Sequence, residues 1–491
     1  MSSVYSILFA LFGVVAVGLF HAEIYFPIGL SVAILVFVSL YLLQQYRQKR
    51  LGILMLLIWL VYALPFIHIP PYIWFEFSQD PLLLWGLAVN PYMVDEQVIT
   101  LTAMIGAVGG MGIAFGASLN SRRIQQDFGI NPDGSKRLFR TIAMPVWLAW
   151  VVIGVALTAL SAPQETIFTA TYTASKSALD GANFSSAWMM SYVILSFAFC
   201  DALLERQTVI KYLKMKIILA AIILIVVFFQ LLRGDRESVP WVFGLALVYY
   251  YWAAGITQRC CFTIPWLKIA GLAFGLVAIS MVLGAIRSGL TGASLADASA
   301  LIGDLYESES IGLANALHGT WSAALLTPLS VAGDHIYGLL AVKWGQDYLN
   351  LFLSIIPGFL ADAIGYIRPI DMGQGPAWEM RYGIGGTHAT VVPFMNFRML
   401  GVFLGPAIWI FIMVNYEKMA LRQLSVIRLS LLVTIAMASP HWLWYGEKNG
   451  FNALVLWLIL AFFYRVSLGL SRSAVVPRSL SKRHRILDVK P

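Results

Sequence analysis

Long apolar runs separated by short polar connections dominate this sequence. A helix needs about 20 predominantly apolar residues to cross the hydrocarbon core of a bilayer. Twelve runs approach or reach that length, namely 4–20, 24–43, 51–69, 98–119, 141–160, 184–204, 217–232, 241–257, 269–286, 401–414, 429–444 and 451–466. The pattern predicts an all-α polytopic integral membrane protein with about 12 transmembrane helices.

The composition agrees with that pattern and narrows the class of protein. Of 491 residues, 59% are hydrophobic and 12% are charged, and the mean hydropathy is +0.77. Soluble domains are about 45–50% apolar and about 25% charged. These values exclude a disordered chain, a cytosolic enzyme and a nucleic-acid-binding protein, despite a net charge of +8. The first run has no basic flank before it, so we expect a retained helix and not a cleaved signal peptide.

The basic residues predict the orientation. Cytoplasmic connections of membrane proteins carry an excess of lysine and arginine. If all of the runs cross, the basic connections share one side, and they hold Arg47, Lys49, Arg50, Arg122, Arg123, Lys136, Arg137, Arg140, Arg206, Lys211, Lys214, Lys216, Arg259, Lys268, Lys418, Arg422, Arg428 and the tail 467–491. We therefore expect a single multi-pass membrane domain, residues 1–491, with both termini and the basic tail in the cytoplasm.

The connection 287–400 is much longer than the others. It follows the ninth of the predicted crossings, so a chain that begins in the cytoplasm has this connection outside the cytoplasm. It contains two semi-apolar runs, 321–329 and 349–367. One added crossing would place every later basic connection outside the cytoplasm, against the charge rule. The extra segments that dip into the membrane therefore number zero or two. Pro357 and Asp362 within the second run favour an interfacial or re-entrant helix over a full crossing.

Two arginines stand on the predicted outer side in a very short turn. Arg233 and Arg236 follow the seventh run, where the charge rule disfavours cations. One interpretation is an internally neutralised turn, because Asp235 and Glu237 are adjacent. The other is a phosphate site, because the planar guanidinium is a preferred partner of phosphate oxygens.

The long outer connection carries further candidates for an anion site. A glycine-rich turn with Gly385, Gly386 and His388 lies between Arg381 and Arg398, and Arg287 precedes the connection. Glycines let the backbone approach a ligand and turn several N–H groups toward an anion. We therefore expect these arginines and the turn to bind a diphosphate.

Proton transfer at such a site needs a base. His388 is a candidate general base, and a phosphate donor or a structural hydrogen bonder are its alternative roles. The acidic candidates are Glu307, Glu309 and Glu379. We expect no metal ion and no cofactor. The apolar runs hold almost no charged residues near their midpoints, which argues against an ion-coupled transporter.

Three short patches resemble the Wzy-type O-antigen polymerases, which join lipid-linked oligosaccharide repeat units. They are the turn at 231–236, the Ile-Pro segment 355–360 followed by Arg368-Pro369, and the glycine-rich stretch 383–401 with Asn396-Phe397. The many spans and the large outer connection are similar as well. Pro393-Phe394 stands where that family has an acidic–aromatic pair, so this position supplies no carboxylate.

The resemblance implies a membrane glycosyltransferase (GT-C-like) at the periplasmic face of the bacterial inner membrane. Its donor is a glycan on undecaprenyl diphosphate, its acceptor is one repeat unit on the same lipid, and the product serves O-antigen or exopolysaccharide synthesis in the lipopolysaccharide pathway. The expected partners are membrane lipid, a chain-length regulator and a flippase, with no nucleic acid. Three alternatives stay open: an O-antigen ligase that transfers the glycan to lipid A core, a flippase or other transporter of lipid-linked oligosaccharides, and a structural partner of that machinery.

Overall fold

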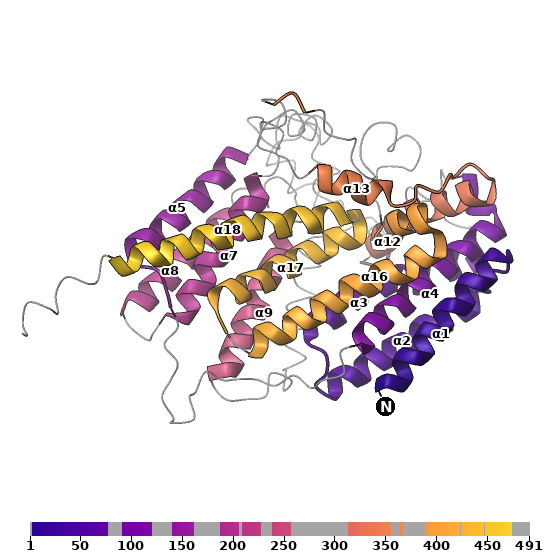
Figure 1. Ribbon diagram of the computed structural model, residues 1–491, viewed down its shortest axis with the longest axis horizontal. Coiled ribbons are helices and arrows are strands. Elements are labelled where there is room, and N and C mark those ends of the chain that lie inside the picture. Colours follow the sequence, from indigo (N-terminus) through magenta and orange to yellow (C-terminus); the bar gives the residue numbers. More distant parts are fainter. Residues whose placement is uncertain are drawn as a thin grey trace, which may run out of the picture.

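The computed structural model describes residues 2–76, 91–119, 140–161, 187–205, 209–226, 238–256, 313–354, 364–366, 388–422, 424–445 and 447–473. Every regular element in these ranges is helical (Figure 1). The elements are α1 (Ser2–His21), α2 (Ile28–Arg47), α3 (Ile53–Glu76), the 3-10 turn η3 (Pro91–Val94), α4 (Glu96–Ser118), α5 (Met144–Ser161), α7 (Ala187–Leu204), α8 (Val209–Leu224), α9 (Ser238–Ile256), α12 (Leu313–Ile336), α13 (Gln346–Leu353), α16 (Val391–Arg422), α17 (Val426–Tyr445) and α18 (Glu447–Ser473).

The helices confirm the predicted class, a helical membrane protein. Among the described residues, 6 helices are long and apolar enough to cross a bilayer, namely α1, α2, α3, α4, α16 and α18. Shorter apolar stretches lie in α5, α7 and α17. Each predicted run falls on one of these helices or on α8 or α9, except the ninth run, 269–286, which lies outside the described residues. The semi-apolar run 321–329 lies within α12, and α13 covers the start of the run 349–367.

The predicted start of the seventh run differs from the structure by eight residues. This run begins at residue 217, whereas α8 begins at Val209 and therefore includes Lys211 and Lys214. Both lysines are buried. Lys214 donates to the Oδ2 atom of Asp201 at 2.9 Å, so its charge is paired and the helix continues through it. A hydropathy pattern cannot show that pairing.

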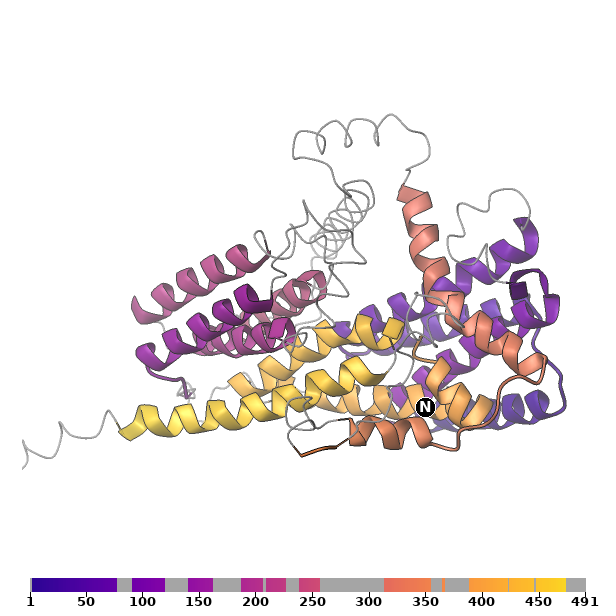
Figure 2. The same ribbon diagram turned by 90° about the horizontal axis from the view of Figure 1, so that it is seen from above.

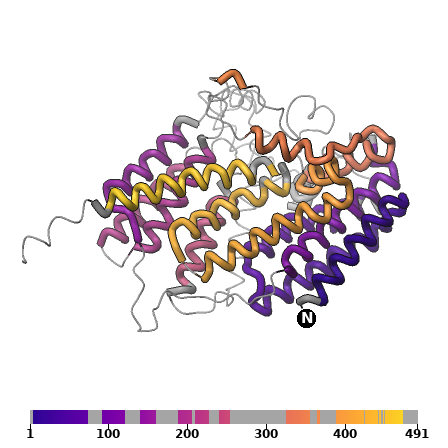
Figure 3. Tube along the Cα trace, in the orientation of Figure 1, coloured from indigo at the N-terminus to yellow at the C-terminus, as the bar shows by residue number. Residues whose placement is uncertain are grey.

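The C-terminal helices join two groups of helices. In Figure 2, α1 to α4 (indigo to purple) and the magenta helices lie at opposite ends, with the orange and yellow helices running along both. α16 packs on α4 and α1, α17 packs on α9 and α7, and α18 packs on α7. Figure 3 shows the same arrangement as a tube along the Cα trace.

Two glycines of α4 set how closely α16 approaches it. A Cβ at Gly112 would lie 2.1 Å from the carbonyl oxygen of Phe403, and a Cβ at Gly116 would lie 2.2 Å from that of Ala407. Small residues of this kind let the backbones of membrane helices touch. Because α16 holds one of the predicted site arginines, this contact also positions the site.

Buried polar contacts fix the helix ends next to the predicted cytoplasmic connections. Glu417 near the end of α16 accepts from the hydroxyl of Tyr251 in α9 at 2.5 Å, and from the backbone N–H groups of Gly52 and Leu54 at the start of α3. The hydroxyls of Ser6 in α1 and Ser118 in α4 lie 2.8 Å apart. These contacts join the beginnings of α1 and α3 to the ends of α4, α9 and α16. We call this the Glu417 end of the bundle.

A second buried cluster joins α5, α7, α8 and α18. Asp201 accepts from the backbone N–H of Ile142 at 3.0 Å, from Lys214 and from the hydroxyl of Tyr464. Lys214 also donates to the carbonyl oxygen of Ile142 at 3.0 Å and to Glu205 at 2.8 Å. Every charged group of the cluster therefore has a partner, and the cluster is a structural clamp.

Candidate functional site

The structure describes two of the predicted site residues, His388 and Arg398. Both belong to the opposite end of α16 from Glu417, which we call the Arg398 end; it comprises 92–95, 334–354, 388–398, 442–445 and 447–450. The other predicted site residues lie outside the described residues, namely Arg233, Arg236, Arg287, Glu307, Glu309, Glu379, Arg381, Gly385 and Gly386.

Arg398 stands at a break in α16. The backbone leaves helical geometry at Phe397, and Arg398 has φ 54° and ψ −144°, a conformation that favours glycine. Gly401 permits the break, because a Cβ there would lie 2.2 Å from the carbonyl oxygen of Pro393. The turn 391–396 therefore folds back against the long part of α16. A strained non-glycine residue of this kind costs about 1–3 kcal/mol and is typical of functional sites.

The guanidinium of Arg398 is only partly satisfied. Its Nη2 donates to the carbonyl oxygen of Leu340 at 2.5 Å, and its Cζ lies 5.5 Å from the ring centroid of Phe394. Its Nη1 is buried and has no hydrogen-bond partner among the described residues. A buried cationic donor without an acceptor is costly unless it meets an anion. Arg398 is therefore the described residue best placed to bind a phosphate.

An aromatic wall surrounds the guanidinium. Phe394 makes an edge contact with His335, and His335 stacks on Phe20 with ring centroids 5.0 Å apart. Burial and the nearby charge of Arg398 lower the pKa of His335, so this imidazole is neutral at physiological pH. The wall therefore covers one side of the half-buried Arg398 without adding a second positive charge.

A short helix, α13, is fixed across this end of the bundle. Asn396 donates to the Oδ2 atom of Asp347 at 2.9 Å and accepts from the backbone N–H of Gly345 at 3.0 Å. Gly345 has φ 86°, where an L side chain would be strained. Lys343 pairs with Asp347 at 3.1 Å. The contacts hold the first turn of α13 against the break at Arg398, and the ring of Tyr348 stacks on Phe397.

His388 has different neighbours from Arg398. It lies against the rings of Tyr62 and Phe66 in α3 and is almost fully buried. Its Nδ1 accepts from the backbone N–H of Thr390 at 3.3 Å and lies 2.9 Å from the hydroxyl of the same residue. The proton of the neutral ring then belongs on Nε2, which is buried without a partner among the described residues. Burial also lowers the pKa of His388. This arrangement favours His388 as a hydrogen-bond donor through Nε2 over His388 as a general base.

A carboxylate that the sequence analysis does not single out lies at the same end. Glu447 begins α18, directly after α17, and its Oε1 accepts from the hydroxyl of Tyr348 at 3.4 Å. Its Oε2 is buried without a partner among the described residues. Burial, with a smaller contribution from the charge of Asp347, raises the pKa of Glu447 to about 7. The only signal in the sequence is an acidic residue in a short outer hairpin, which is typical of any solvated turn.

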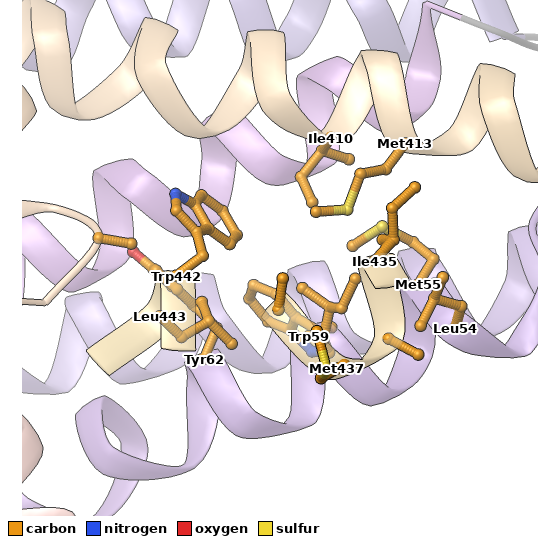
Figure 4. Close-up of a cluster of buried hydrophobic side chains, with 14 of the residues drawn as sticks. Leu54, Met55, Trp59, Tyr62, Ile410, Met413, Ile435, Met437, Trp442 and Leu443 are labelled. Carbon is orange, nitrogen blue, oxygen red and sulfur yellow. The ribbon is translucent and has the colours of Figure 1, made fainter. Parts of the chain in front are cut away.

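Five buried polar atoms without a partner among the described residues lie at this end of the bundle or on the adjoining part of α16, whereas others, such as Ser31 Oγ and Arg50 Nε, lie elsewhere. The five are His388 Nε2, Arg398 Nη1, Trp409 Nε1, Trp442 Nε1 and Glu447 Oε2. Native proteins pair more than about 90% of their buried polar groups, so such a group of exceptions indicates a place for a polar ligand or water. Figure 4 shows Trp442 at one side of an apolar cluster that includes Ile410 and Met413, with its indole nitrogen turned away from them.

Comparison of the chain with known protein families, with curated proteins and with solved structures finds no match.

Proposed function

We propose that the chain polymerises lipid-linked oligosaccharide repeat units on undecaprenyl diphosphate, at the periplasmic face of the inner membrane. The resemblance of the patches at 231–236, 355–360 and 383–401 supports this function. The structural observation that carries it is Arg398: a strained arginine next to Asn396-Phe397, with a buried and unpartnered Nη1.

The chemistry of the reaction needs such a group. When a sugar hydroxyl attacks the anomeric carbon of the donor, the bond from that carbon to the diphosphate oxygen breaks, and the electron pair leaves with the diphosphate. Positive groups that are already in place stabilise this developing charge, because they need no reorganisation during the reaction. Arg398 offers Nη1 for that purpose, while Nη2 is held by the carbonyl oxygen of Leu340.

The surroundings of Arg398 suit a lipid-linked donor. Apolar helices surround the long part of α16 that follows Arg398. Apolar side chains such as Leu8, Leu11 and Val15 of α1 are exposed on the outside of the bundle. A polyprenyl tail is soluble only in such surroundings, whereas its diphosphate needs the polar boundary of the membrane. A cation at the end of a long apolar helix meets both requirements.

Substitution of Arg398 separates its chemical role from a structural one. Arg398→Lys keeps the charge but cannot reproduce the planar, forked contact with phosphate, so we expect most of the polymerising activity to be lost. Arg398→Gly removes the guanidinium and also relieves the backbone strain at φ 54°. We therefore expect this variant to be inactive yet about as stable as the natural chain.

The matched control is Arg428, which lies at the Glu417 end and also donates to a carbonyl oxygen, that of Met419, at 3.2 Å. Arg428→Lys should keep its activity. The measurement is polymer length from purified protein supplied with lipid-linked repeat units, together with thermal unfolding of each variant. Normal polymer from Arg398→Gly would show that the strained arginine has no part in the reaction.

A further inference from the structure

We infer that Glu447 is the catalytic base of the transfer, which takes the proton from the attacking hydroxyl of the acceptor sugar. This inference rests on the proposed function, because it assigns a role in the same reaction. It goes beyond the sequence analysis, which sought the base at His388, Glu307, Glu309 or Glu379.

Geometry separates Glu447 from the neighbouring carboxylate, Asp347. Asp347 is paired with Lys343 at 3.1 Å and accepts from the side chain of Asn396 at 2.9 Å. Glu447 accepts from the hydroxyl of Tyr348 at 3.4 Å and from its own backbone N–H, and its Oε2 has no donor among the described residues. A base must keep a lone pair available for the proton that it receives. Glu447 satisfies this condition, whereas Asp347 is committed to the attachment of α13.

The position of Glu447 links it to the arginine. Tyr348 reaches Glu447 through its hydroxyl and stacks on Phe397, with ring centroids 6.2 Å apart. Phe397 immediately precedes Arg398 at the break in α16. Tyr348 and Phe397 therefore connect Glu447 to the break at Arg398. A donor diphosphate at Arg398 and an acceptor hydroxyl at Glu447 would be held at the same end of the bundle.

A second observation indicates a polar ligand near the first turn of α18. Trp442 is almost fully buried, and its Nε1 has no partner among the described residues. A Cβ at Gly450 would lie 3.7 Å from the Cβ of Trp442 and 3.5 Å from the ring of Trp409. Buried indole N–H groups usually find an acceptor. Sugar hydroxyls supply such acceptors.

The proton balance of the step is simple. The acceptor oxygen forms a bond to the anomeric carbon, its proton passes to Glu447, and undecaprenyl diphosphate leaves with the electron pair of the broken bond. The protonated carboxyl then returns its proton to water. The groups that face Glu447 from α13 are Tyr348 and Asp347, and the burial that raises the pKa of Glu447 to about 7 makes it an effective base near neutral pH.

The test uses the purified full chain in lipid nanodiscs, with a lipid-linked repeat unit as both donor and acceptor. The initial rate of polymer formation is measured between about pH 5.5 and pH 9, a range that brackets the expected titration. For the natural chain, we expect the rate to rise as the pH increases through about 7, because the base acts only when it is deprotonated. Glu447→Gln should lower the rate about 10²–10⁴-fold and remove this dependence on pH.

Two further variants keep the test informative. Glu447→Asp retains a carboxylate and should keep a pH-dependent, reduced rate, even if the glutamine variant folds poorly. Asp347→Asn is the matched control: it weakens the attachment of α13 and removes a negative charge that helps to raise the pKa of Glu447, so the rate should still rise with pH but at a somewhat lower pH. If Glu447→Gln polymerises with the natural rate and pH profile, Glu447 is not the base, although the proposed function stands. If the natural chain forms no polymer at any pH, the proposed function and the role of Glu447 both fall.

Discussion

The close approach of Gly112 to the backbone of α16 allows a sharp test of the fold. In Gly112→Ala, the new Cβ would lie 2.1 Å from the carbonyl oxygen of Phe403, whereas carbon–oxygen contacts are ordinarily about 3.3–3.6 Å long. α4 and α16 must therefore separate by about 1 Å. Overpacking of this kind costs about 1–3 kcal/mol.

A matched variant removes the effect of helix propensity from that comparison. Replacing a helical glycine by alanine is intrinsically favourable by about 1 kcal/mol. Gly18 of α1 is also helical, but a Cβ there meets nothing within 4 Å. Gly18→Ala should therefore gain stability, and the difference between the two variants should be the overpacking cost, about 1–3 kcal/mol.

The assay is unfolding of each purified variant in the same detergent, with activity measured in parallel. Gly112→Ala should unfold at a lower temperature than Gly18→Ala. It should also lose activity, because α16 carries Arg398. Equal stability of the two variants would refute the close approach of α4 and α16, and with it the way in which the site is positioned.

Two other outcomes follow from the structure. Lys214→Met leaves the carboxylate of Asp201 buried without its cation, and should destabilise the chain by about 3–5 kcal/mol, as judged by thermal unfolding; adding Asp201→Asn should recover much of this loss, and a stable single variant would contradict the clamp. The orientation can be tested in a chain whose three cysteines are replaced by serine. Trp344→Cys should react with an impermeant thiol reagent from outside and Lys49→Cys should not, because both positions are exposed but belong to opposite ends of the bundle. The reverse labelling would contradict the predicted orientation.

The helices could be predicted from the sequence because lipid leaves an apolar chain few choices. Without water to bind its N–H and C=O groups, a spanning segment must satisfy them internally, so a long apolar run becomes a helix. The same argument cannot find a break inside a helix. The break at Arg398 depends on the contact of Gly401 with Pro393 and on the hydrogen bonds of Asn396 to α13, which join residues about 50 positions apart.

The candidate site was predictable only in part. Arg398 stands out because a cation on the outer side contradicts the charge rule, and this signal needs only the order of the spans. Glu447 gives no such signal, since acidic residues are common in outer turns. Its importance arises from the hydroxyl of Tyr348, which is 99 positions away, and from its unpartnered Oε2. The tautomer of His388 likewise depends on Thr390 and is visible only in the folded chain.

If this chain joins lipid-linked repeat units, its reaction product is a longer glycan on the same lipid, and that product can be measured. The natural chain, purified and returned to a bilayer, is supplied with single repeat units on undecaprenyl diphosphate, in the presence and absence of lipid A core. We expect a ladder of longer glycans on the same lipid, with release of undecaprenyl diphosphate and no need for lipid A core. Transfer to lipid A core without elongation, or movement of unchanged single units across the bilayer, would contradict the account and identify a ligase or a flippase instead.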